Sequence, residues 1–132
     1  MPLMDWSDAY QLGLPLMDDT HQEFVALVNK THDANNADFK VLFTELLTHT
    51  QAHFDKENQL MVATKFPALG EHQAEHQRVI NELKQFKQRV DKGMISFGRA
   101  YIKDRLPEWF ALHTKTMDSA LAVHLQRVNY SA

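Results

Sequence analysis

Apolar side chains recur at helical spacing along four stretches of this chain, and no stretch alternates as a strand would for long. Spacings of three, four and seven residues place side chains on one face of a helix. Helices with short connections can each bury one apolar stripe only by packing together. We therefore predict an all-α, up-down-up-down four-helix bundle over roughly residues 18–128, after an irregular N-terminal arm over 1–17. At this length, residues 1–132 are expected to form a single domain.

Capping and helix-breaking residues mark the expected ends of the first three helices. They are Asp18, Asp19 and Thr20 before the first helix, Asn35, Asn36 and Asp38 before the second, Phe66-Pro67 and Gly70 after it, and Gly93 after the third. Short polar side chains accept hydrogen bonds from the free N–H groups at a helix start. Proline lacks that donor, and glycine accepts the left-handed backbone that ends many helices.

The fourth helix is less regular. Pro107 is either its first residue or a distortion in a helix that starts near Ser96, and we favour the second interpretation. The expected core stripe of this helix consists of Trp109, His113, Met117, Ala120, His124 and Val128.

Composition excludes several kinds of site and partner. The chain has no cysteine, which excludes disulfides, iron–sulfur clusters, thiolate metal sites and a cysteine nucleophile. Its net charge is −3 without a lysine or arginine block, so we expect neither nucleic acid nor an anionic membrane as partner. Residues 1–17 do not read as a signal peptide, and no apolar run approaches the roughly 20 residues of a membrane helix. We therefore expect a cytoplasmic protein.

Histidines and carboxylates interrupt the apolar stripes. The candidate metal ligands are His21 in the first helix, His53 and Glu57 in the second, His72 and His76 in the third, and His113 and Asp118 in the fourth. Side chains four residues apart share a helix face, so the pairs on the second and third helices can each reach one centre. The last pair is five residues apart, about 140° around an ideal helix. We predict a π-bulge there, a feature common at functional sites.

The remaining histidines are expected to lie outside this centre. His32 and His124 are each roughly 16 Å along the helix from the nearest candidate ligand. His49 is one turn deeper than the centre needs, and we interpret it as a core residue or as support for a ligand.

Seven polar groups inside a bundle core are costly unless something compensates them, and a pair of metal ions does. Imidazole and carboxylate without sulfur suit iron, manganese or zinc. Seven protein ligands are too many for one tetrahedral ion. Two six-coordinate ions can accept five histidines, two bridging carboxylates and a single-atom oxygen bridge. One coordination position then stays open, and a small molecule can bind there.

The spaced motifs identify a family resemblance. The order His21, His53-Phe-Asp-Lys-Glu57, His72-Gln-Ala-Glu-His76 and His113-Thr-Lys-Thr-Met-Asp118 resembles the hemerythrins, most closely the single-domain bacteriohemerythrins. Further similar positions are Trp6, the run from Asp18 to Gln22, Asn29 and Trp109. The resemblance implies two non-haem iron ions, ferrous or ferric, with an oxo or hydroxo bridge. It assigns one iron to His72, His76 and His113, the other to His21 and His53, and the bridging role to Glu57 and Asp118.

The resemblance also implies reversible dioxygen binding at the iron with the open position. We expect a carrier, a store or a delivery partner for an oxygen-consuming enzyme, acting as a monomer and not as an enzyme. The alternatives are oxygen or redox sensing, for which this chain offers no output domain, and di-iron oxidase or peroxidase activity. Ferritin-like oxidases use carboxylate-rich sites, whereas a histidine-rich set favours reversible binding.

Thr114 departs from the family, which more often has an aliphatic residue directly after the fourth-helix histidine. A hydroxyl facing the oxygen pocket would speed autoxidation, and one facing outward would have no effect.

Overall fold

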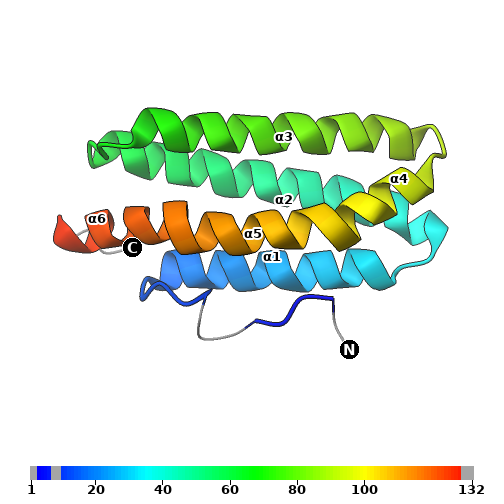
Figure 1. Ribbon diagram of the computed structural model, residues 1–132, viewed down its shortest axis with the longest axis horizontal. Coiled ribbons are helices and arrows are strands. Elements are labelled where there is room, and N and C mark those ends of the chain that lie inside the picture. The colour runs from blue at the N-terminus through cyan, green and yellow to red at the C-terminus, as the bar shows by residue number, and fades with distance from the viewer. Residues whose placement is uncertain (1–2, 7–9, 129–132) are drawn as a thin grey trace.

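A computed structural model of the chain describes residues 3–6 and 10–128. In this part the helices form four antiparallel rods that lie side by side (Figure 1). The first three rods are α1 (Pro15–Asp33), α2 (Asn36–Ala63) and α3 (Leu69–Asp91), and the fourth consists of α4 (Ile95–Ala100), η2 (Tyr101–Arg105), α5 (Leu106–His113), η3 (Thr114–Asp118) and α6 (Ser119–Arg127). The predicted all-α, up-down-up-down bundle is confirmed. None of the described helices is long and apolar enough to cross a membrane.

The fourth rod runs unbroken from Ile95 to Arg127, because the residues that join its segments keep α-helical backbone angles. Its turns η2 and η3 are π-helical, so their hydrogen bonds close one residue later than in an α-helix. Turn η2 ends two residues before Pro107, which has no N–H to donate and whose ring conflicts with the carbonyl four residues earlier. The interpretation of Pro107 as a distortion within a helix starting near Ser96 is confirmed, and Figure 1 shows α4 inclined to α5.

The second π turn, η3, begins directly after His113 and ends at Asp118, where the π-bulge was predicted. The core stripe predicted beyond it is wrong. The buried positions after the turn are Asp118, Leu121, Ala122 and Leu125, whereas the predicted Met117, Ala120, His124 and Val128 are half-buried or exposed. One extra residue rotates the following helix by about 100°, so each core position falls one residue later than a regular helix would place it.

Two of the predicted helix ends are confirmed in atomic detail. The Asn35 side chain accepts a hydrogen bond from the Asp38 amide at 2.9 Å, which caps the start of α2. At the end of α3, Gly93 has φ +89°, and the amides of Gly93 and Met94 donate back to the last turn at 2.9 Å each. This left-handed residue with its two reversed hydrogen bonds ends the helix.

The predicted cap of the first helix is wrong. The helix begins at Pro15, inside the segment expected to be an irregular arm, and no side chain caps its start. Asp18 lies in the first turn, where its carboxylate accepts hydrogen bonds from the amides of Leu12 at 2.8 Å and Gly13 at 3.2 Å. Asp18 therefore ties the incoming chain to the helix instead of capping it. Proline at the first helical position already suits a helix start.

The described part of the N-terminal arm is anchored to α1 and α5. The Met4 amide donates to Asn29 Oδ1 at 2.7 Å, and the Asn29 amide donates back to the Met4 carbonyl at 2.8 Å. Trp6 packs against Tyr10, with ring centroids 5.6 Å apart, and Tyr10 packs against Phe110 at 5.5 Å. Two positions that resemble the family, Asn29 and Trp6, thus fasten the arm to the bundle.

The apolar core consists of two clusters along the bundle axis. The larger includes Phe24, Val28, Phe39, Phe43, Phe54, Leu83 and Phe110. The smaller consists of Met17, Leu60, Met61, Phe66, Leu121, Ala122 and Leu125. Most candidate ligands lie between the clusters along their helix, as His21 lies between Met17 and Phe24, and His53 lies directly beside Phe54 of the larger cluster. A buried polar layer therefore separates two apolar ones.

We predict that the substitution Lys65→Gly stabilises the protein. Lys65 ends α2 with φ +55°, and the amide of the next residue, Phe66, donates back to the Met61 carbonyl at 2.9 Å. A side chain in this left-handed conformation costs roughly 1 kcal/mol that glycine avoids. Urea unfolding of the metal-free protein should show a gain of about that size, and Gly93→Ala should show a loss of about 1 kcal/mol. A lower stability of Lys65→Gly would contradict this account.

Candidate metal centre

The structure brings all seven predicted ligands together from four rods. Their nitrogen and oxygen atoms form two groups, and within each group these atoms lie within 4.8 Å of one another. One group contains Glu57, His72, His76, His113 and Asp118, and the other contains His21, His53, Glu57 and Asp118. Six of these residues are buried, and His53 is nearly so, with 10% of its side chain exposed. Glu57 and Asp118 belong to both groups.

Glu57 directs one carboxylate oxygen to each group. Its Oε1 lies 3.4 Å from His72 Nε2 and 3.3 Å from His76 Nε2. Its Oε2 lies 2.7 Å from His53 Nε2 and 3.9 Å from His21 Nε2. A carboxylate placed this way can bridge two ions, since its two oxygens face separate sets of nitrogen donors.

Asp118 divides its oxygens in the same manner. Oδ1 lies 3.1 Å from His113 Nε2 and 3.2 Å from His72 Nε2, whereas Oδ2 lies 3.2 Å from His21 Nε2. The π turn η3 makes this possible, because it brings Asp118 onto the face that His113 occupies.

Many of these polar atoms have no hydrogen-bond partner among the described residues. Both oxygens of Glu57 and the Nε2 atoms of His21, His76 and His113 are buried without one. Neighbouring donors and acceptors lie within 4 Å without forming hydrogen bonds, as expected when lone pairs point to a shared centre. Unsatisfied buried polar groups are unfavourable. The residues therefore fit a pair of metal ions, which would satisfy these atoms.

Both carboxylates are ionised in the metal-free protein. Burial raises their pKa, but the surrounding imidazoles outweigh burial, so the pKa values of Glu57 and Asp118 lie below their ordinary range. Burial lowers the pKa of His72, yet the neighbouring carboxylates of Asp118 and Glu57 raise it to about 9. Burial also lowers the pKa of His53, but Glu57 and Asp118 together outweigh it and raise that pKa, whereas burial prevails at His76 and lowers its pKa.

Neighbouring side chains orient the third- and fourth-rod histidines. His76 Nδ1 lies 3.0 Å from Asn58 Oδ1, so it can donate there and leave Nε2 free for a metal. The Phe54 ring stacks on His76 at 3.9 Å, and the Trp109 ring stacks on His113 at 4.7 Å. Sequence reasoning missed Asn58, since an amide next to a ligand on a helix carries no periodic signal.

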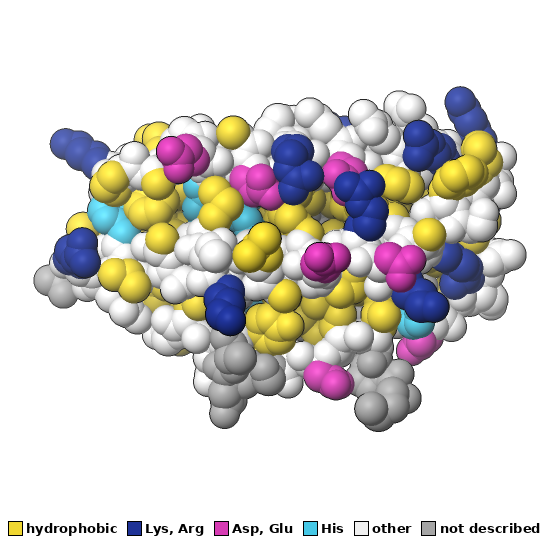
Figure 2. Space-filling view, in the orientation of Figure 1, with side chains coloured by type: hydrophobic (Ala, Val, Ile, Leu, Met, Phe, Trp, Pro, Cys, Tyr) yellow, Lys and Arg dark blue, Asp and Glu magenta, His cyan; other side chains and the backbone are white. Residues whose placement is uncertain are grey.

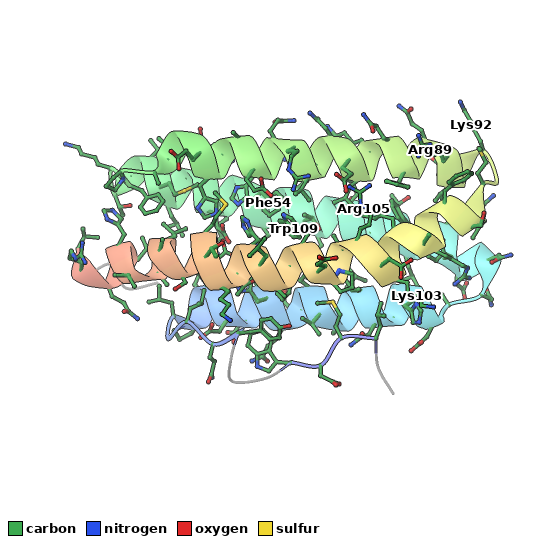
Figure 3. The ribbon with its side chains drawn as sticks, in the orientation of Figure 1. Phe54, Arg89, Lys92, Lys103, Arg105 and Trp109 are labelled. Carbon is green, nitrogen blue, oxygen red and sulfur yellow. The ribbon has the colours of Figure 1, made fainter. Side chains whose placement is uncertain are left out.

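A small cavity of about 10 Å³ lies beside the group with two histidines. Besides His21, His53, His113 and Asp118, its wall consists of Phe24, Thr50, Phe54, Trp109 and Phe110. This space is about that of one water-sized molecule. Figure 3 shows Phe54 and Trp109 close together inside the bundle, between the α2–α3 pair and α5. The sequence predicts Phe54 and Trp109 as core residues of a set in which some also line the pocket, and the structure places both in the wall, whereas the role of Thr50 was missed.

The other histidines lie outside both ligand groups, as predicted. The interpretation of His49 as a core residue or as support for a ligand is wrong, because this residue is half-buried and its Nε2 lies 3.3 Å from the exposed carboxylate of Glu23. His124 Nε2 donates to the Thr64 carbonyl at 2.8 Å. Thr114 is buried, but it is not among the residues that line the cavity. Neither expectation for its hydroxyl, facing the pocket or facing outward, describes this position.

Comparison with known proteins agrees with this geometry. Residues 12–125 match the family model described as the hemerythrin HHE cation binding domain. The chain belongs to the hemerythrin family. A bacteriohemerythrin of Ralstonia nicotianae is 37% identical over 125 residues, which cover 95% of this chain and 90% of that protein. A myohemerythrin of Riftia pachyptila is 26% identical over 86% of each chain.

A hemerythrin crystal structure shares the fold. It superposes with a TM-score of 0.84 at 22% identity and covers 95% of this chain and 98% of that one.

In this hemerythrin-family chain, charged side chains of both signs are interspersed on the face seen in Figure 2, and neither sign forms a continuous block there.

We predict that metal binding releases protons at pH 7.5. The pKa of His72 is about 9 in the metal-free protein, so its ring is protonated at pH 7.5 and neutral well above pH 9. A metal ion needs the neutral ring, so binding must displace that proton. A pH indicator in weak buffer should report acid release when Zn²⁺ is added at pH 7.5, and less release per bound ion from His72→Gln, which lacks that proton. Equal release from the two proteins would contradict the raised pKa.

Proposed function

We propose that this chain binds dioxygen reversibly at a non-haem di-iron centre within a single hemerythrin-like domain. In this proposal His72, His76 and His113 would hold one iron, His21 and His53 would hold the other, and Glu57 and Asp118 would serve both, together with an oxo or hydroxo group. When bound, the two irons supply the two electrons that dioxygen takes up on binding.

One observation carries this proposal: both carboxylates face histidines of the two groups, and the histidines are divided unequally between those groups. The group with His72, His76 and His113 has one more imidazole than the group with His21 and His53. The cavity adjoins the second group, at His21 and His53, and includes neither His72 nor His76. A ligand position that the protein leaves open therefore coincides with the space for a small molecule.

The walls of the cavity favour an apolar diatomic ligand over water. Phe24 and Phe110 stack at 4.8 Å, and Phe110 meets the edge of His21 at 5.5 Å. Apolar walls exclude water, which slows the loss of bound oxygen as peroxide. The chain's contribution is thus to orient the imidazoles, hold the carboxylates ionised and keep the ligand dry. A carrier, a store or a partner of an oxygen-consuming enzyme would each use these properties.

We predict that Glu57→Ala lowers the iron content below two per chain. Glu57 is common to both ligand groups, so its loss removes a ligand from each ion at once. Metal analysis after anaerobic loading with Fe²⁺ measures the ratio. Glu45→Ala on the exposed face of the same helix is the matched control and should keep two irons. Two irons in Glu57→Ala would overturn the bridging assignment.

We also predict that the iron-loaded, reduced protein cycles with oxygen. Absorption bands should appear in the visible spectrum when oxygen is admitted and should bleach under argon over repeated cycles. A single conversion to a stable ferric form, or steady consumption of oxygen with a reductant, would instead favour a sensor, an oxidase or a peroxidase.

A further inference from the structure

We propose that Glu75 is a positioning residue that holds the indole of Trp109 as a dry wall of the oxygen cavity. This inference rests on the proposed function, since it concerns how the same cavity retains its ligand. Glu75 is one of the residues between the ligands His72 and His76, but its side chain belongs to neither ligand group.

The cavity wall turns its own polar hydrogens away from the ligand. Apart from the candidate metal ligands, only Thr50 and Trp109 in the lining carry an O–H or N–H on the side chain. Thr50 Oγ1 donates to the Leu46 carbonyl at 2.7 Å. Trp109 Nε1 donates to Glu75 Oε1 at 2.8 Å. Neither acceptor lines the cavity, so both hydrogens are bound outside it.

Glu75 is itself fixed by a second partner. Arg78 Nη2 donates to Glu75 Oε1 at 2.7 Å, and Arg78 Nε donates to Oε2 at 3.2 Å. Arg78 also lies 3.3 Å from Glu82, one turn further along α3. The carboxylate that receives the indole hydrogen is therefore held from the outer side of α3, and it links that helix to α5.

The held indole covers both a ligand and the cavity. Its ring stacks on His113 at an angle of 21°, and it meets the edges of Phe54 at 6.0 Å and Phe24 at 6.5 Å. Without an acceptor at position 75, the half-buried N–H must find another partner. Water is the available one, so the indole would tilt and admit water beside the ligand.

Water and protons beside bound dioxygen promote autoxidation. In that reaction the two ferrous ions each give one electron to dioxygen, two protons are taken up, and hydrogen peroxide leaves a ferric pair. We therefore expect Glu75→Leu, which has no acceptor, to autoxidise about tenfold faster than the parent protein, the factor that corresponds to one lost hydrogen bond. Glu75→Gln keeps an acceptor oxygen and should stay close to the parent rate.

The experiment compares Glu75→Leu, Glu75→Gln and Glu45→Leu, the last being the same chemical change on the exposed face of α2. All are made in a Trp6→Phe background, because the chain has two tryptophans and this leaves Trp109 as the only one, which is excited selectively at wavelengths that tyrosine does not absorb. Acrylamide quenching of the metal-free proteins reports access to the Trp109 indole, and decay of the oxygenated spectrum reports autoxidation. Greater quenching and faster decay are expected in Glu75→Leu alone.

Equal quenching in all variants, or equal decay of Glu75→Leu and Glu75→Gln, would overturn the proposal. A parent protein that does not return oxygen under argon would contradict the proposed function instead. The quenching measurement needs no iron, so it still decides whether Glu75 positions Trp109.

Discussion

Two carboxylates buried in the core of a helix bundle are the constraint on which this structure depends. Glu57 and Asp118 are 2% and 1% exposed, and their ionised forms would be strongly unfavourable there without compensation. Five imidazoles supply it, from all four rods. Because each carboxylate needs nitrogen donors on both sides, no rod can shift far without leaving a buried charge unpaired. The centre therefore determines the register of the bundle as much as the bundle positions the centre.

The π turn between His113 and Asp118 links that constraint to the fold. A regular helix would point these side chains about 140° apart, and the extra residue places both on one face. The same residue changes the core face of α6, so that Leu121 and Leu125 are buried there and form part of the smaller apolar cluster. A single backbone irregularity thus sets both the second bridging carboxylate and the packing of the last helix.

The two sides of the centre differ in what surrounds them. On the side with three histidines, Phe54 and Asn58 hold His76 in place, and the cavity walled by Phe24 and Phe110 does not reach His72 or His76. On the other side the aromatic rings leave a small space against His21 and His53. The asymmetry comes from side chains on α1, α2 and α5 together, because each contributes an aromatic residue to the wall.

The sequence by itself determined the helical class, the seven candidate ligands and the need for a π turn. Each of these depends on spacing along one helix, which the periodicity of 3.6 residues makes readable. The tertiary structure alone decided which carboxylate oxygen faces which histidine, since those distances join different rods. It also decided that Phe24, Thr50 and Phe110 enclose the cavity, that Thr114 lies outside it, and that Glu75 receives the Trp109 hydrogen. Such contacts depend on how the rods are rotated against one another. The stripe beyond Asp118 shows why: the π turn was predictable from spacing, but the rotation it imposes on α6 becomes visible only when α6 packs against its neighbours.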